Sequence, residues 1–331
     1  MACNLCPRFC KAERGMGQRG YCGMTEEVTV ARVAPHFWEE PCISGQMGSG
    51  TVFFSGCNLR CVYCQNHKIA AGMAGQRMTT EELSAAFLSL QKQGCHNINL
   101  VTPSHYVPQI REALLKARPD IPVVYNTSSY ECVQTLRQME GLVDIYLADL
   151  KYLDSGLAAQ YSHAADYPET AKAAIAEMVR QVGGIEYELA PESNQEENGA
   201  ELCCELGPEN ERGNAENVRK REGLRIENAT EYPDGALMKR GVIVRHLLLP
   251  GQVEEAKRVL RYLYETYGDT IAVSILNQYT PLPHVAAYPE LNRKVTEEEY
   301  EEVVEFALEL GIEHGFLQEG EAATESFIPD F

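Results

Sequence analysis

The sequence predicts an α/β fold: a partial (β/α)6 barrel, preceded by a cysteine-rich cap and carrying an acidic insertion on its surface. The first observation is that short apolar runs alternate with helical patterns through most of the 331 residues. Strands joined by helices pair in parallel, because returning to the same edge of a sheet needs a long crossover. The second observation is that six such units are present, fewer than the eight of a closed barrel. An open doubly wound sheet is the alternative.

Six runs have the composition of buried strands. Each is short and rich in Val, Ile, Leu or aromatic residues, which favour a pleated, buried surface. The first of them ends in Gly56 and leads directly into a loop with three cysteines. The six runs cover residues 51–56, 97–101, 123–127, 144–150, 242–249 and 271–276.

Helical segments separate most of these runs. The segment 79–94 begins with Thr79 and two acids, which are N-terminal signals, and then spaces Leu83, Phe87 and Leu90 at helical intervals. An apolar stripe of this kind predicts a helix that covers one face of a sheet. The other helical stretches span residues 107–117, 132–139, 170–182 and 253–268.

Composition divides the chain into a small cap and a large domain. Residues 1–45 are rich in Cys, Gly and Arg and predict a loop-rich cap, whereas residues 46–331 contain the barrel. Within the barrel, residues 186–238 are polar, rich in Glu, Asn and Gly, and without a sustained period. Such a segment cannot bury enough apolar surface to form a core, so it is expected to be a surface insertion. Its role is not evident from the sequence.

Charge and hydropathy exclude several classes of protein. The net charge is −19, and no excess of Lys or Arg is present to displace counterions from nucleic acid. No run of about 18 apolar residues occurs, which argues against a membrane protein. The first residues, MACNLCPRFC, lack the apolar core of a signal peptide, so we expect a cytoplasmic location. Twelve cysteines in that reducing compartment indicate metal ligands and buried thiols rather than disulfides.

The loop after the first strand holds Cys57, Cys61 and Cys64 within eight residues. A closed structural zinc site takes four ligands, and a 4Fe–4S cluster normally takes four thiolates. Three thiolates on such a cluster leave one iron open to a further ligand, for example the amine and carboxylate of S-adenosylmethionine. The alternative is part of a zinc ribbon, with His67 as a conceivable fourth ligand.

The motif CNLRCVYC fits the pattern CxxxCxΦC, in which Φ is aromatic, and resembles the radical S-adenosylmethionine enzymes. The segments NINLVTPSHY, VVYNTSSY, DIYLADLKY, RHLLLPG and NQYTPL extend the resemblance over nearly the whole chain outside the insertion. Together they resemble uncharacterised homologues of pyruvate formate-lyase-activating enzyme. The resemblance implies a 4Fe–4S cluster that reductively cleaves S-adenosylmethionine to methionine and a 5′-deoxyadenosyl radical. That radical abstracts a hydrogen atom from the substrate.

The resemblance also implies roles for individual residues around the cofactor. Tyr63 would lie near the adenine, and the segment Thr102, Pro103 and Ser104 stands where the family has a glycine-rich segment that meets the methionyl amine. The two glycines of that segment are absent here. The remaining implied contacts are polar residues at strand ends, namely Asn126, Ser128, Asp149, Lys151, Arg245 and Gln278. His246, Tyr125, Tyr130 and Tyr279 are interpreted as packing or structural residues.

A second cysteine group, Cys3-x2-Cys6-x3-Cys10-x11-Cys22, lies in the cap. Four thiols satisfy either a tetrahedral zinc ion or a closed iron–sulfur cluster, and the sequence does not decide between them. A short, glycine-rich segment with few large apolar residues would gain stability from such a site. The other cysteines are interpreted as core thiols (Cys42, Cys95 and Cys132) or are given no role (Cys203 and Cys204).

The leading functional hypothesis is a radical S-adenosylmethionine enzyme of activase type. The resemblance implies a glycine of a partner protein as substrate and a flavodoxin or ferredoxin as electron donor. A radical enzyme that modifies a small molecule or a peptide is the alternative, and a non-catalytic iron–sulfur or zinc-binding protein is a further one. The substrate and the oligomeric state do not follow from the sequence.

Overall fold

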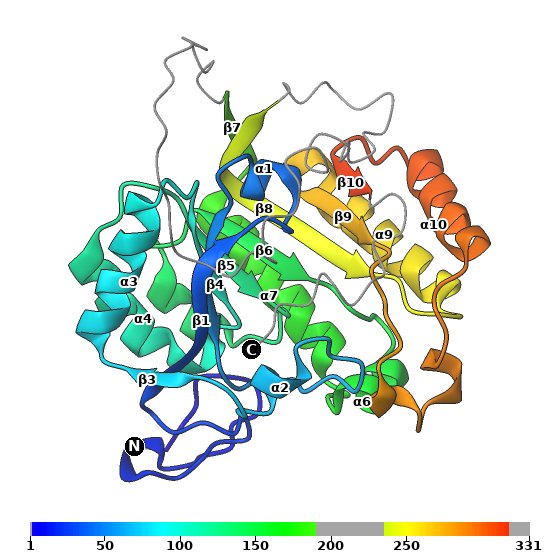
Figure 1. Ribbon diagram of the computed structural model, residues 1–331. Helices are drawn as coiled ribbons and strands as arrows, with labels where there is room; N and C mark the ends of the chain where they lie inside the picture. Colours follow the sequence, from blue (N-terminus) through cyan, green and yellow to red (C-terminus); the bar gives the residue numbers. More distant parts are fainter. Residues whose placement is uncertain (1, 190–234, 318–331) are drawn as a thin grey trace, which may run out of the picture.

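A computed structural model describes residues 2–189 and 235–317 of the protein (Figure 1). All six predicted strands are present, and each pairs in parallel with its neighbour. Their apolar runs are buried on both faces, as parallel strands covered by helices must be. The strands are β2 (Ser49–Phe54), β4 (Ile98–Val101), β5 (Val123–Thr127), β6 (Ile145–Asp149), β8 (Ala236–Leu247) and β9 (Ala272–Leu276).

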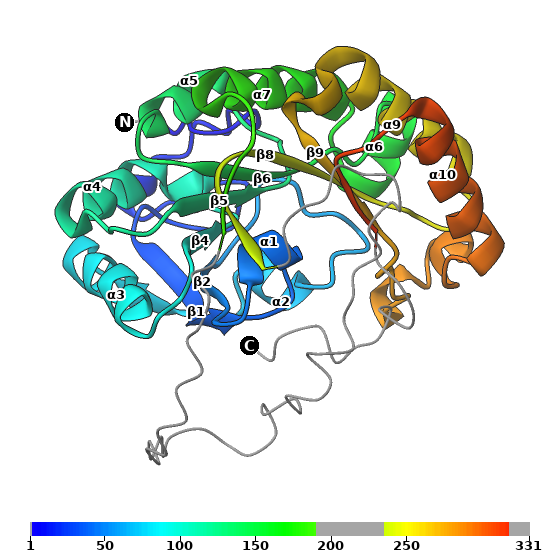
Figure 2. The same ribbon diagram turned by 90° about the horizontal axis from the view of Figure 1, so that it is seen from above.

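The strand order distinguishes a partial barrel from a doubly wound sheet. From β2 the order is β2, β4, β5, β6, β8, β9, and it never reverses. A doubly wound sheet has a point at which the order reverses and helices on both faces. Here the sheet curves, and the larger helices lie along its outer, convex side (Figure 2). The sheet is not closed, since its path ends at β3 on one side and at β10 (Gly315–Leu317) on the other.

The outer helices follow the predicted segments closely. The longest predicted pattern becomes α3 (Thr80–Lys92), which begins with a capping box between Thr79 and Glu82. Two helices of the outer layer were not predicted, α6 (Ser155–Ser162) and α10 (Glu297–Leu310). None of the helices in the described ranges combines the length and the apolar character that crossing a bilayer requires. The other long helices are α4 (Val107–Ala117), α7 (Tyr167–Val182) and α9 (Val253–Tyr267), with the single turns α2 (His67–Ala70) and α5 (Val133–Leu136).

The loop-rich N-terminal segment is shorter than the sequence indicates. Residues 2–27 contain only one short 3-10 turn, but β1 (Val28–His36) then pairs antiparallel with β2 and with β3 (Gln76–Met78). The helix α1 (Pro41–Ser44) follows and lies inside the curved sheet (Figure 2). Residues 28–45, assigned to the cap from their composition, are therefore part of the barrel. The alternating pattern of β1 is weak because one of its faces is only partly buried.

The helix α1 covers the amino end of the sheet's inner face. Ile43 is fully buried there and packs in a cluster with Val124 and Leu147 of the inner strands. Burying a side chain of this size contributes about 1.5–3 kcal/mol to folding. The amino end of the inner face is therefore filled by α1.

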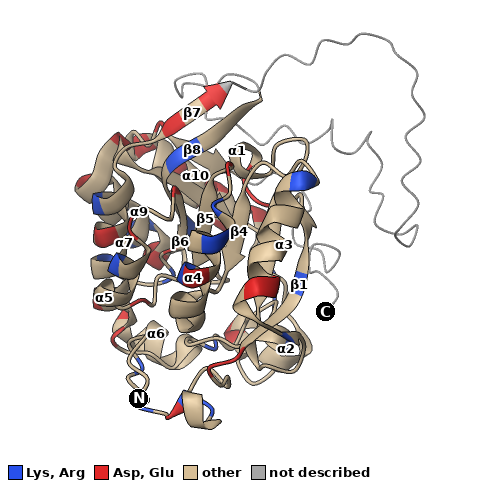
Figure 3. Cartoon of the chain, turned by 90° about the vertical axis from the view of Figure 1, so that its left-hand side faces the viewer, with Lys and Arg blue, Asp and Glu red and all other residues tan. Residues whose placement is uncertain are grey.

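The ends of the predicted insertion belong to the sheet. The short strand β7 (Glu186–Leu189) pairs antiparallel with the first part of β8, in the register Leu189↔Ala236. Lys239 and Glu188 form an ion pair of 2.7 Å across this ladder, whose opposite charges are visible in Figure 3. Met238 is buried in the inner cluster. The prediction that residues 186–238 form no core element is therefore wrong for Met238, whereas the side chains of Glu186 and Glu188 in β7 are exposed; residues 190–234 lie outside the described residues.

Replacing residues 190–234 with a short Gly/Ser linker should leave soluble expression and iron binding nearly unchanged, because their composition is too polar to supply a core. Removing all of residues 186–238 should instead lower stability, since Met238 is then lost from its buried site. Thermal unfolding and iron content of the two variants measure this. Aggregation of the 190–234 variant would contradict the prediction.

Candidate functional site

The three-cysteine loop lies at the carboxyl edge of the sheet, between β2 and α2. Two residues with positive φ shape it, Gly56 at 88° and Arg60 at 60°. A side chain at position 56 would bring its Cβ within 2.3 Å of Met24 and within 2.8 Å of the Cys22 carbonyl oxygen. Only glycine allows the loop to pack this closely against the N-terminal segment.

The sulfur atoms of the loop receive hydrogen bonds. The Ser162 hydroxyl donates to Cys61 Sγ at 3.1 Å, and the Leu59 amide donates to Cys57 Sγ at 3.4 Å. Burial raises the pKa of the Cys61 and Cys64 thiols, so these groups need a bound cation to be held as thiolates. A pocket opens beside them, lined by Arg60, Cys61, Cys64, His67, Ala70 and Ala71.

The donor set fits a cluster better than a single ion. No group of three or more His, Cys, Asp or Glu side chains in residues 2–189 and 235–317 is arranged to hold one metal ion. A 4Fe–4S cluster makes no such demand, because each thiolate binds a different iron atom. His67, the conceivable fourth zinc ligand, instead packs its ring against His284 with centroids 4.5 Å apart. Three thiols with hydrogen-bond donors at their sulfurs are the ligands that an iron–sulfur cluster uses.

A charged network lies on the inner face of the sheet. We define it as Glu39, Asn126, Asp149, Lys151 and Arg245. Arg245 is at its centre: its guanidinium donates to Asp149 at 2.9 Å, to Glu39 at 3.1 Å and to Asn126 at 2.7 Å. Lys151 adds a second ion pair with Asp149, at 2.8 Å. Four of the strand-end residues that the resemblance implies are thus brought together.

The network is largely shielded from water, so its charges depend on one another. Burial alone would raise the pKa of Asp149, but the positive charges of Arg245 and Lys151 outweigh it and lower the pKa. Burial would lower the pKa of Lys151, and Asp149 together with the Cys61 sulfur raises it instead. Asp149, Lys151 and Arg245 are therefore charged at neutral pH, and Lys151 places a positive charge near Cys61.

Glu39 is the main residue that the sequence did not reveal. It follows β1, just before α1, and its carboxylate accepts hydrogen bonds from Asn99 and Asn126, both at 3.1 Å. Burial raises its pKa, and Arg245 opposes that shift. The sequence contains one indication of Glu39, the pair of acids before Pro41, but the composition assigned those residues to the cap. Glu39 lies on the inner face because β1, the strand before it, pairs with the sheet.

The segment after β4 contains one residue in a backbone conformation that is typical of glycine. Thr102 has a φ of 58°, in the left-handed region where β-branched residues are rare. Its amide donates to the Asn126 carbonyl at 2.9 Å, which holds the turn in place. The Ser104 side chain donates to Glu131, and burial raises the pKa of Glu131 to about 7. The Ser104 hydroxyl is therefore engaged within the protein.

The remaining residues that the resemblance implies lie around the same carboxyl edge of the sheet. Tyr63 is buried, accepts a hydrogen bond of 2.6 Å from the Tyr152 hydroxyl, and meets the Tyr279 ring at 6.3 Å. The Ser128 carbonyl accepts from the Tyr167 hydroxyl at 2.9 Å, and the Gln278 carbonyl from Gln65 at 2.7 Å. The roles of these residues toward a cofactor stay predictions.

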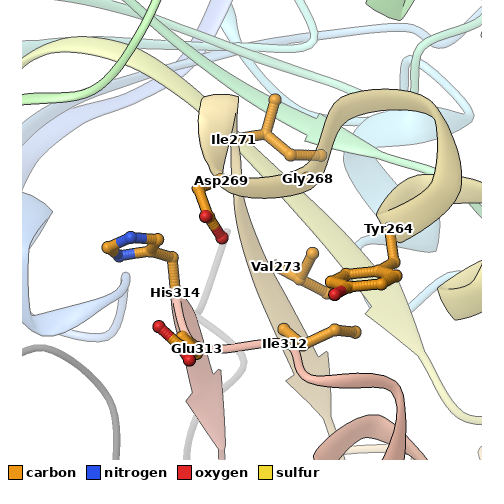
Figure 4. A pocket seen from close by; sticks show the side chains of 8 residues that line it. All are labelled: Tyr264, Gly268, Asp269, Ile271, Val273, Ile312, Glu313 and His314. Carbon is orange, nitrogen blue, oxygen red and sulfur yellow. The ribbon is translucent and has the colours of Figure 1, made fainter.

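Other polar features belong to the scaffold. His246 is buried and its Nδ1 bonds to the Leu150 carbonyl at 2.8 Å, in keeping with a structural histidine. Tyr125, Tyr130 and Tyr279 are buried. A small pocket lies at the opposite edge, at the amino ends of β9 and β10, with the Tyr264 ring of α9 beside Val273 and Ile312 on one side and Glu313 and His314 on the other (Figure 4). It is separate from the cysteine loop.

Comparison with known proteins finds a family profile that matches part of the chain. The profile of the family described as Radical SAM superfamily matches residues 51–183. Among curated proteins, "Uncharacterized protein MJ0674" of Methanocaldococcus jannaschii is 23% identical over 313 residues, which cover 92% of this chain and 74% of that protein.

Two similar solved structures are those of Streptococcus suis SuiB, bound to the precursor peptide SuiA and bound to S-adenosylmethionine. In each case the TM-score is 0.45, the identity is 10%, and the alignment covers 80% of this chain. The chain spans about half of SuiB, 47% and 49% in the two structures. The matched range 51–183 begins within β2, contains all three cysteines of the loop and extends through α7. Residues 51–183 are therefore the part of the chain that is similar to the Radical SAM superfamily.

Proposed function

We propose that this protein is a radical S-adenosylmethionine enzyme whose Cys57, Cys61 and Cys64 hold a 4Fe–4S cluster. The observation that carries the proposal is the three-thiol loop at the carboxyl end of β2, within the matched domain and beside the charged network. When bound, the cluster and S-adenosylmethionine supply a one-electron cleavage that yields methionine and a 5′-deoxyadenosyl radical able to abstract hydrogen.

The protein's own groups would hold and tune the cluster. The Ser162 hydroxyl and the Leu59 amide donate to sulfur atoms, and such hydrogen bonds stabilise the reduced, more negative form of an iron–sulfur cluster. The Lys151 ammonium adds a positive charge whose field reaches Cys61. Each of these contacts raises the reduction potential of a cluster bound there.

The charged network is suited to recognise an amino acid group. A free ligand with an ammonium and a carboxylate, such as the methionyl end of S-adenosylmethionine, pairs with Asp149 and with Lys151 or Arg245. The other proposed contacts with S-adenosylmethionine are Tyr63 for the adenine, the backbone of residues 102–104 for the amine, and Asn126, Ser128 and Gln278 for its polar groups.

The preferred substrate is a glycine of a partner protein, as the likeness to glycyl-radical activases implies. Because α1 covers the amino end of the inner face, a substrate approaches from the carboxyl edge where the cysteines lie. The sheet is open, which suits a protein loop or a peptide better than a closed barrel would. A small molecule or peptide is the second candidate. A reduced flavodoxin or ferredoxin would supply the electron.

Anaerobic reconstitution with iron and sulfide, followed by reduction in the presence of S-adenosylmethionine, tests the proposal. Chromatography should show 5′-deoxyadenosine and methionine in equal amounts. A protein that binds a cluster but makes neither product would instead be an electron carrier, and the proposal would be wrong.

Two readouts then separate the substrate classes. Incubating the reduced enzyme with anaerobic extract of the source cells should give a glycyl-radical doublet in electron paramagnetic resonance. A silent spectrum, together with deuterium transfer from a labelled peptide or metabolite into 5′-deoxyadenosine, would establish the second candidate.

A further inference from the structure

The N-terminal segment folds around its four cysteines. A carbon added to Gly20 would lie 3.3 Å from the sulfur atoms of both Cys10 and Cys22. The side chains of Cys3 and Cys10 are hydrogen-bonded, and Cys6 lies near enough to Cys3 and Cys22 for their charges to act on it. The four thiols that the sequence spaces over residues 3–22 therefore gather in one place.

A buried arginine points to a negative charge at this place. Arg14 is only 5% exposed, and its Nη1 lies 3.8 Å from Cys3 Sγ. Its hydrogen bonds go to the carbonyl oxygens of Met24, Thr25 and His105, which carry no net charge. In the part of the chain that the structure describes, no carboxylate forms an ion pair with it. A buried guanidinium is costly without an anion, and metal-bound thiolates would provide one.

The place of the four thiols favours a cluster over a zinc ion. Both centres take four thiolates, and both would supply the negative charge beside Arg14. A zinc ion has no redox chemistry, whereas a 4Fe–4S cluster can accept and pass on one electron. The four thiols adjoin the three-cysteine loop, whose proposed chemistry consumes one electron in each turnover. We propose that Cys3, Cys6, Cys10 and Cys22 bind a second 4Fe–4S cluster, next to the three-cysteine loop.

The second site touches the first through the backbone. The Cys57 amide donates to the Cys22 carbonyl at 3.3 Å, so one hydrogen bond joins a ligand of each cysteine group. Arg8 stabilises the contact between the N-terminal segment and the loop, because its side chain donates to the Asn58 carbonyl at 2.8 Å. The Arg8 guanidinium also lies over the rings of Tyr21 and Tyr130. The second cluster therefore has a short covalent and hydrogen-bonded path to the first.

This path suits electron entry, a role that rests on the proposed function of the three-cysteine loop. The second cluster accepts one electron from a reduced flavodoxin or ferredoxin and passes one electron to the cluster on Cys57, Cys61 and Cys64. No atom is transferred, and the second cluster returns to its oxidised state in each turnover. Arg14 sets its potential through the positive charge near Cys3.

The decisive measurement uses the triple variant Cys57→Ala, Cys61→Ala, Cys64→Ala, in which the first cluster cannot form. Metal analysis after reconstitution should find about four irons per chain, and reduction should give the paramagnetic signal of one cluster. About one zinc per chain, or no metal, overturns the proposal. Because this variant has no catalytic cluster, the result does not depend on whether the enzyme cleaves S-adenosylmethionine.

Two further variants test Arg14 and the relay. In the same triple background, Arg14→Gln should lower the midpoint potential of the second cluster, whereas Arg14→Lys, which keeps the charge, should shift it less; equal potentials contradict the role of Arg14. With the first loop intact, Cys6→Ala should slow cleavage driven by flavodoxin more than cleavage driven by dithionite. An unchanged ratio of the two rates would contradict the relay and leave the second cluster as a structural centre.

Discussion

Replacing any one of Cys57, Cys61 and Cys64 with alanine is expected to reduce formation of 5′-deoxyadenosine to the level of an enzyme-free control. Each sulfur binds its own iron atom, so the loss of one thiolate removes a ligand that no neighbouring group replaces. His67 cannot substitute readily, because its ring packs against His284. Chromatography of the reduced, reconstituted variants with S-adenosylmethionine measures the product.

Matched variants separate this effect from a general loss of folding. Cys95 is buried in the main core, away from the loop, and Cys95→Ala should retain product formation. Ser162→Ala removes only the hydrogen bond to Cys61 and should lower cluster affinity or activity by about 10–100-fold, as the loss of an outer ligand contact does. Full activity of Cys61→Ala would exclude the three-cysteine loop as the catalytic centre.

Arg245→Met is expected to destabilise the protein by about 3–5 kcal/mol, because it leaves Glu39 and Asp149 without their main counter-charge inside the sheet. Urea unfolding of the metal-free protein measures the change. The exposed pair Arg77–Glu27 provides the control, with side chains 71% and 58% exposed. Arg77→Met should cost no more than about 1 kcal/mol. Similar effects of the two substitutions would contradict the central position of Arg245.

The pH dependence of the Arg245→Met effect has a definite sign. In the wild type the pKa of Asp149 is lowered, so its contribution is present above the ordinary carboxyl pKa and is lost as the pH falls through the lowered value. Without Arg245, the pKa of Asp149 rises because Lys151 alone then opposes the effect of burial, and the pKa of Glu39, which burial already raises, rises further. The folded variant then binds more protons than the unfolded chain, and its stability rises as the pH falls. The deficit relative to the wild type should therefore shrink in acid.

The parallel part of the fold could be predicted because its signals are local. Each run such as 123–127 is rich in residues that favour strands and is buried on both faces, and each helix such as 79–94 has its own N-terminal cap and apolar stripe. The strand β1 was missed because one face is only partly buried and its partner comes later in the chain. The ends of the insertion were missed for a similar reason, since the β7–β8 ladder joins residues on the two sides of a long polar stretch.

The sequence predicts the candidate site only where the positions of residues along the chain indicate their chemical role. The three cysteines of the loop are recognisable from their intervals, and Asp149, Lys151 and Arg245 from their place at strand ends. Glu39 has no such signal, because a glutamate before a proline is common at the start of a surface helix. Its function depends on β1 carrying it to the inner face, which is a property of the assembled sheet.

The ion pair between Glu39 and Arg245 spans 206 residues, and this has a consequence for synthesis of the chain. The cysteine loop leaves the ribosome long before β8 exists, while Glu39 and Asp149 still lack their counter-charge. Contacts of such long range form late and slow the folding of a domain. The nascent loop thus remains attached to an unfinished sheet for much of translation, and delivery of iron and sulfide is best timed after β8 has docked.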